Sequence, residues 1–143
     1  MERLQQLFAA QPIVSIVFVG LTLAIVVNEL RALTRKWKTV SPAQLTDLIN
    51  RHDALVIDVR GQGDFEKGHI LGAKHLLPSQ LDPANKVLAK AGERPVVLVC
   101  ATGMTAPASA GTLVKAGFRQ VSVLDGGVGA WQAAGLPLAR GKA

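Results

Sequence analysis

Cysteine and tyrosine are almost missing from this chain. Its 143 residues include one cysteine and no tyrosine, and aromatic residues make up only 4%. A single cysteine excludes an internal disulfide and a four-cysteine zinc site, and it agrees with a reducing compartment. A nucleic-acid surface needs a basic stripe with interleaved aromatic side chains, so we expect no nucleic-acid partner despite the formal net charge of +6.

Charge is absent from a long stretch near the amino terminus. Residues 4–28 contain no Asp, Glu, Lys or Arg. Because a bilayer core of about 30 Å needs about 20 apolar helical residues, residues 7–27 predict one transmembrane helix, with membrane lipid as its partner. A buried globular helix is rarely apolar on every face for this length, and a helix on a lipid surface would carry a charged face. A cleaved signal would have its basic residues before the apolar run, whereas here Arg3 alone precedes it, beside Glu2.

Basic residues follow the apolar run instead. They are Arg31, Arg35, Lys36 and Lys38. Since basic residues next to a span tend to stay in the cytoplasm, we expect the amino terminus outside and the rest of the chain inside. Anionic headgroups are sufficient to explain this cluster, at about 1 kcal/mol per basic residue.

The chain is expected to have three regions. Residues 1–30 form a tail and the transmembrane helix, residues 31–39 form a basic juxtamembrane tether, and residues 40–143 form a globular domain. The last region is long enough for one hydrophobic core and too short for two.

Short apolar runs alternate with helical segments in the globular region. Ser41 and Gln44 form a capping-box pattern that begins a helix reaching about Asn50. Apolar runs typical of buried strands are residues 54–57, 96–99 and 121–124. The glycines between residues 61 and 72 indicate turns, and further helices are expected at residues 83–91, between Cys100 and Gly117, and at residues 126–134. This alternation predicts an α/β fold with a central, mainly parallel sheet and helices on both faces.

Cys100 stands directly after the apolar run 96–99. In an open α/β sheet, sites lie past the carboxyl end of a strand, where a loop enters the next helix. The small residues 101–105 allow backbone amides to turn toward the sulfur, Thr105 is suited to cap the helix, and Pro107 is tolerated in its first turn. Such amides and a helix amino terminus lower the pKa of a thiol and stabilise a thiolate, a persulfide or a bound oxyanion. Position alone leaves a second interpretation open, in which Cys100 is a buried core residue.

Three ordered motifs resemble the rhodanese-like domain family. The first signature corresponds to Asp58, Val59 and Arg60 with DFEKGHILGA at residues 64–73. The active-site loop corresponds to CATGMT at residues 100–105, and the segment that closes the domain corresponds to residues 113–131. The whole chain resembles small bacterial inner-membrane members of the family. The resemblance implies a three-layer rhodanese-like fold, preceded here by the amino-terminal transmembrane helix.

The resemblance also implies sulfur transfer. In the family, the loop cysteine takes a sulfane sulfur from a donor such as thiosulfate and passes it, as a persulfide, to cyanide or a thiol acceptor. Carried over, Cys100 is the nucleophile, no cofactor is needed, and the loop amides bind the outer sulfur; they belong to Ala101, Thr102, Gly103, Met104 and Thr105. Thiosulfate-using members often have Arg or Lys in this loop, and residues 101–104 have neither. Thiosulfate is therefore expected to be a poor donor, while neutral donors or donors delivered by a partner protein stay open.

Other polar residues have structural interpretations. Asp58 and Arg60 are expected to hold turns together, and His69 is expected to bond backbone groups. No metal site is expected, since His52 and His75 lack metal-ligand spacing. The glycines at 126, 127 and 129 open the final helix and lack the setting of a dinucleotide motif.

Two further functions compete with sulfur transfer. A catalytically weak or inactive rhodanese-like module would mediate protein–protein interaction at the inner membrane, with membrane proteins as its partners. A cysteine phosphatase of related fold needs Arg six positions after the cysteine, where Ala106 stands.

Overall fold

The computed structural model describes residues 1–34 and 36–142. Arg35, one of the predicted basic residues after the apolar run, lies outside the described residues. The chain divides into two units, Met1–Arg35 and Lys36–Ala143, and each is described by itself.

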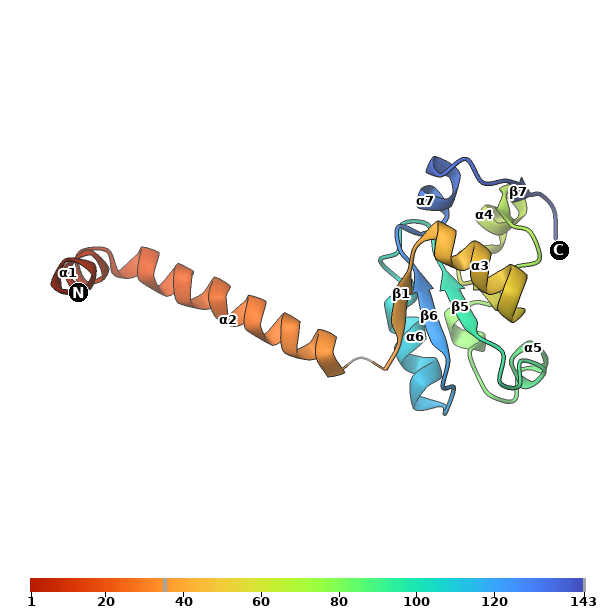
Figure 1. Ribbon diagram of the computed structural model, residues 1–143, viewed down its shortest axis with the longest axis horizontal. Coiled ribbons are helices and arrows are strands. Elements are labelled where there is room, and N and C mark those ends of the chain that lie inside the picture. The colour runs from red at the N-terminus through yellow and green to blue at the C-terminus, as the bar shows by residue number, and fades with distance from the viewer. Residues whose placement is uncertain (35, 143) are drawn as a thin grey trace. The chain divides into compact units, whose positions relative to one another are not determined.

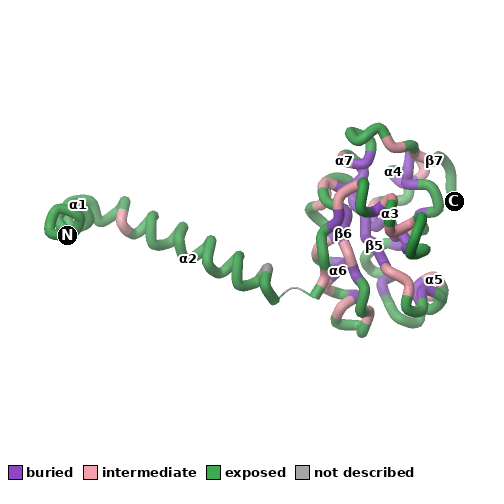
Figure 2. Tube along the Cα trace, viewed as in Figure 1, coloured by how far each residue is buried: buried purple, intermediate pink, exposed green. Residues whose placement is uncertain are grey.

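The amino-terminal unit consists of two helices, α1 (Glu2–Ala10) and α2 (Pro12–Thr34). Gln11, with φ −136° and ψ 77°, separates them, and Pro12 has no N–H to continue the first helix. The segment predicted as one helix at residues 7–27 is therefore divided at Gln11. Within α2, Pro12–Arg31 is long and apolar enough to cross a membrane, with a mean hydropathy of 2.3 and none of its most apolar window buried (Figure 2). One amino-terminal apolar helix is thus confirmed, and its insertion in a membrane stays a prediction.

Five short parallel strands form the main sheet of the second unit, in the order β1-β6-β5-β2-β4. Their bounds are β1 Lys38–Val40, β2 Leu55–Asp58, β4 Lys74–His75, β5 Val96–Val99 and β6 Val121–Leu124. The predicted central parallel sheet is confirmed. Lys38 and Thr39, which the sequence placed in the tether, are the first two residues of β1.

Helices cover both faces of this sheet (Figure 1). One face packs against α3 (Pro42–His52), α4 (Gln62–Lys67) and α7 (Gly127–Ala133), and the other against α5 (Lys86–Ala89) and α6 (Ala106–Lys115). Alternate strand residues face opposite sides, so that Leu98 joins the α6 side and Val97 the α3 side. All four residues of β5 are buried, and full burial of each apolar side chain contributes about 1.5 to 3 kcal/mol.

The predicted helix starts are partly confirmed. Ser41 and Gln44 form the capping box that begins α3, with bonds of 2.8 and 3.2 Å. The helix expected at residues 83–91 is shorter, because Asn85 caps it by accepting a bond from the Val87 N–H at 2.9 Å. The glycine-rich stretch predicted as turns contains α4, which buries Phe65 completely.

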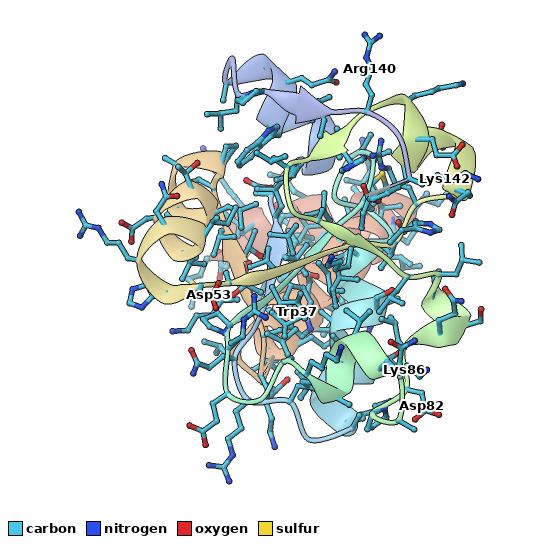
Figure 3. All side chains as sticks on the ribbon, turned by 90° about the vertical axis from the view of Figure 1, so that its right-hand side faces the viewer. Trp37, Asp53, Asp82, Lys86, Arg140 and Lys142 are labelled. Carbon is cyan, nitrogen blue, oxygen red and sulfur yellow. The ribbon has the colours of Figure 1, made fainter. Side chains whose placement is uncertain are left out.

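A second, two-stranded sheet closes the domain. The strands β3 (His69–Ile70) and β7 (Leu138–Ala139) pair antiparallel. In Figure 3, Arg140, which follows β7, projects from the end of the domain opposite to Lys86 on α5. The start of α7 bonds the chain past the carboxyl end of β5, through the Val128 N–H and the Cys100 carbonyl, whereas Leu88 of α5 lines a hollow with Gln120, directly before β6. The carboxyl ends of the parallel strands therefore lie toward α7, and their amino ends lie toward α5.

Candidate functional site

Cys100 lies directly past the carboxyl end of β5, at the predicted position. Its side chain is only 2% exposed and belongs to the hydrophobic cluster on the α6 side. Cys100 is thus both a buried core residue and a thiol next to backbone N–H donors. The two interpretations that the sequence left open, a core residue and a nucleophile, do not exclude each other.

Hydrogen-bond donors surround the sulfur. The Gly103 N–H donates to Cys100 Sγ at 3.0 Å. Burial raises the pKa of the Cys100 thiol, but the Thr105 hydroxyl and the N–H groups of Ala106, Thr105 and Gly103 lower it, and the net pKa is below its ordinary value. The site therefore favours a thiolate.

Thr105 has a different role from the predicted one. It occupies the N-cap position of α6, but its side chain makes no capping hydrogen bond. The Thr105 hydroxyl is instead directed at the Cys100 sulfur, where it lowers the thiol pKa. Pro107 lies in the first turn of α6, as predicted.

The predicted cradle residues are not equivalent. Gly103 and Thr105 direct N–H groups at the sulfur, and so does Ala106, which lies one residue beyond the predicted loop. Ala101 and Thr102 are exposed, and the Met104 side chain is 83% exposed at the surface of the loop. The N–H groups directed at the Cys100 sulfur therefore belong to the second half of the loop and the start of α6.

The amino terminus of α7 holds the first half of the loop. The Val128 N–H donates to the Cys100 carbonyl at 2.9 Å, and the Gly129 N–H donates to the Ala101 carbonyl at 3.1 Å. Gly127, at φ +60°, lies so close that an added Cβ would be 2.1 Å from the Cys100 carbonyl oxygen. The sequence placed these glycines correctly at a helix start, but no short-range pattern showed that they contact the Cys100 loop.

Asp58 and Arg60 hold the neighbouring loop, as predicted. The Arg60 guanidinium donates to Asp58 at 2.7 to 3.1 Å and to the Gly68 carbonyl at 2.7 Å. Asp58 is 1% exposed, and the Arg60 guanidinium compensates its negative charge inside the domain. Neither residue contributes to the donors around the sulfur.

The two histidines near this loop also bond backbone groups. His69 is buried, contacts the Phe65 carbonyl through Nδ1 at 2.8 Å, and stacks on the Phe65 ring at 3.8 Å. His75 Nε2 lies 2.6 Å from the Arg60 carbonyl. In residues 1–34 and 36–142, no three His, Cys, Asp or Glu side chains are grouped to hold a metal ion.

We expect the variant Thr105→Val to slow alkylation of Cys100 several-fold at neutral pH. Loss of the hydroxyl removes a hydrogen bond to a charged acceptor, so the pKa of the thiol rises toward its ordinary value and the thiolate fraction falls. The measurement is the rate of iodoacetamide reaction as a function of pH. Thr102→Val is the matched control, since Thr102 is exposed in the same loop; equal profiles for the two variants would contradict the assigned role of Thr105.

Comparison with known proteins agrees with this geometry. Residues 41–134 match the family model of the rhodanese-like domain. The chain is 43% identical to the uncharacterized protein YibN of Escherichia coli K12, over 99% of this chain and 100% of YibN. It is 35% identical to the thiosulfate sulfurtransferase GlpE of Pseudoalteromonas translucida, over 68% of this chain and 91% of that protein.

A solved structure has the same fold. The thiosulfate sulfurtransferase of Pseudomonas aeruginosa superposes with a TM-score of 0.67 and 33% identity. The match covers 74% of this chain but spans only 20% of that longer chain. The family match over more than half of the sequence, the parallel sheet and the placement of Cys100 together show that the chain belongs to the rhodanese-like domain family.

Proposed function

We propose that this protein is a membrane-anchored sulfurtransferase that carries sulfane sulfur as a persulfide on Cys100. The observation that carries the proposal is the set of donors around Sγ, led by the Gly103 N–H at 3.0 Å, which lowers the pKa of a buried thiol. Two relatives described as thiosulfate sulfurtransferases support the reaction class.

The reaction has two displacement steps. The Cys100 thiolate attacks the outer sulfur of the donor, a new S–S bond forms, and the donor's S–S bond breaks, so that sulfite leaves thiosulfate or a thiolate leaves a persulfide donor. An acceptor thiolate then attacks the outer sulfur of the Cys100 persulfide. The second S–S bond breaks, its electron pair returns to Sγ, and the cycle needs no external oxidant or reductant.

The donor is expected to carry less negative charge at its sulfane group than the thiosulfate dianion does. Residues 101–106 contain no Lys or Arg to neutralise thiosulfate. Arg60, on the loop after the neighbouring strand β2, is already bonded to Asp58 and Gly68. We therefore propose a low-molecular-weight or protein persulfide as the preferred donor, with thiosulfate as a slower one.

The anchor in this proposal is the apolar segment Pro12–Arg31 of α2. Arg31 ends this segment and Lys36 and Lys38 follow it, and this excess of positive charge supports an orientation with the amino terminus outside and the rhodanese-like domain in the cytoplasm. A bacterial inner membrane fits the organism of the relative that matches over the full length.

The test is intact mass spectrometry of the full chain after incubation with a donor. We expect the wild-type protein to gain the mass of one sulfur atom, faster with glutathione persulfide than with thiosulfate, and to lose it when a thiol acceptor is added. Cys100→Ser is the control and should gain nothing, because Cys100 is the one cysteine.

A wild-type protein that gains no sulfur from either donor would contradict the proposal. That result would favour the second candidate, an interaction module at the membrane, for which the absence of a cation from the loop is the supporting observation. A phosphatase has no comparable support, since the buried Ala106 occupies the position where a phosphate-binding Arg would be needed.

A further inference from the structure

Four basic side chains lie at the edge of the sheet where β1 and β6 begin. Lys36 lies two residues before β1 and Lys38 begins it, Lys115 ends α6, and Arg119 lies two residues before β6. The strands β1 and β6 pair in parallel, so these segments start side by side. All four side chains are exposed. We call the surface that Lys36, Lys38, Lys115 and Arg119 form at this end of the sheet the entry edge.

Carboxylates are sparse around the entry edge. No Asp or Glu occurs in residues 30–46 or 94–124. Within the described part of the chain, no ion pair involves any of the four basic residues. Of the acidic residues in the loops before β2 and β5, Asp53 is paired with Arg94, while Glu93 is exposed. The four positive charges are therefore largely uncompensated by the protein.

Two aromatic residues accompany these charges. Trp37 stands between Lys36 and Lys38, and Phe118 directly precedes Arg119. Both rings are half-buried against the hydrophobic cluster on the α6 side, so part of each ring stays accessible. In Figure 3, Trp37 lies in the same half of the domain as Lys86 and away from Arg140. Half-buried aromatics flanked by Lys or Arg are typical of surfaces at a membrane interface.

A hollow opens at the same end of the domain. It has a volume of about 720 Å³, and Phe118, Arg119, Arg94 and Glu93 are among its lining residues. Arg94 is engaged with Asp53, which leaves Arg119 as the lining cation outside any ion pair of the described residues. The hollow is large enough for a phospholipid headgroup next to that guanidinium.

We propose that the entry edge binds an anionic lipid surface and thereby turns the Cys100 loop toward the aqueous phase. The inference rests on the membrane-anchored location proposed above. Because Cys100 follows the carboxyl end of the four-residue strand β5, its loop lies about 13 Å or more from the edge where β5 begins. A bilayer bound at the entry edge leaves the Cys100 loop facing the aqueous phase, from which soluble donors and acceptors approach.

The test uses the full chain in nanodiscs, with Cys100→Ser combined with one new cysteine for a bimane label. The matched positions are Gln120→Cys, next to the entry edge, and Gln132→Cys, on α7 at the other end; both glutamines are exposed. Quenching by a headgroup-nitroxide lipid is measured with neutral lipid alone and with about one third phosphatidylglycerol. A label at Gly20→Cys, quenched by lipids brominated in their acyl chains, reports whether α2 is inserted.

With phosphatidylglycerol, we expect stronger quenching at position 120 than at position 132. The difference should fall in neutral lipid and at about 0.5 M salt, where screening is strong. The double variant Lys115→Gln with Arg119→Gln should lower the ratio of lipid-bound to unbound domain about thirty-fold. The same double variant made without a label, so that it keeps Cys100, should load sulfur at the wild-type rate.

The remaining outcomes contradict either the inference or one of the proposals on which it rests. Equal quenching at positions 120 and 132, or quenching insensitive to lipid charge and to the double substitution, shows that the edge does not bind anionic lipid. An unquenched label at position 20 shows that α2 is not inserted in the bilayer, and this contradicts the proposed anchor as well. Failure of sulfur loading contradicts the proposed enzymatic activity alone. The three readouts therefore separate failure of the lipid surface from failure of the proposed function.

Discussion

Gly127→Ala is expected to destabilise the domain by about 3 kcal/mol or more and to lower sulfur loading about a hundredfold in the protein that remains folded. The added Cβ would lie 2.1 Å from the Cys100 carbonyl oxygen and 2.8 Å from the Ala101 carbonyl carbon. Both are backbone atoms, so the overlap cannot be relieved by rotating a side chain. Alanine would also be strained at a φ of +60°, a backbone conformation that glycine adopts without cost. The loop must therefore move away from α7, and the donors around the sulfur move with it.

Gly129→Ala is the matched control for this prediction. Gly129 lies two residues further along α7, is exposed, and its added Cβ would make only an ordinary contact of 3.5 Å with the Ala101 carbonyl oxygen. Alanine there keeps the N–H that bonds Ala101 and should stabilise the helix by up to about 1 kcal/mol. Urea unfolding in detergent and the rate of sulfur loading check both variants. Equal stability and equal loading would mean that α7 does not position the Cys100 loop.

Local sequence patterns predicted the elements that place Cys100. The run at residues 96–99 is buried on both sides and reads as a strand, and Gly117, at φ +102°, follows the end of α6 as expected. Because an α/β sheet exposes the carboxyl ends of its strands to the loops that form sites, the position of Cys100 followed from those two elements alone. The capping box at Ser41 and Gln44 was predictable because both of its hydrogen bonds join residues only three apart in the sequence.

Contacts between distant segments were not predictable from such patterns. The strands β3 and β7 have two residues each, and their pairing joins His69 to Ala139, which no local periodicity indicates. The helix α4 forms among glycines because Phe65 is buried, a tertiary effect that overrides low helix propensity. The role of Thr105 was predicted wrongly because the hydroxyl of a threonine at a helix start can either accept a bond from a backbone N–H of the first turn or donate one to another group nearby. Here it donates to the Cys100 sulfur, whose position in the fold decides between the two.

Replacement of Arg60 by methionine is expected to destabilise the domain by about 3 to 5 kcal/mol. Arg60→Met removes the guanidinium bonds to both Asp58 oxygens and to the Gly68 carbonyl, at 2.7 to 3.1 Å. Asp58, 1% exposed, would keep only the bond from the Arg60 backbone N–H, at 3.0 Å. A buried charge without its partner is far more costly than the pair itself contributes.

Arg94→Met is the matched control for Arg60→Met, because it breaks an ion pair with Asp53, whose side chain is 86% exposed. Water solvates Asp53 when its partner is lost, so the expected loss is at most about 1 kcal/mol. The double variant Asp58→Leu with Arg60→Met removes both buried charges and should recover a large part of the loss caused by Arg60→Met alone. The free energy of unfolding in urea measures all three variants. If Arg60→Met and Arg94→Met lose equal stability, or if the double variant recovers nothing, the uncompensated charge of Asp58 is not the cause.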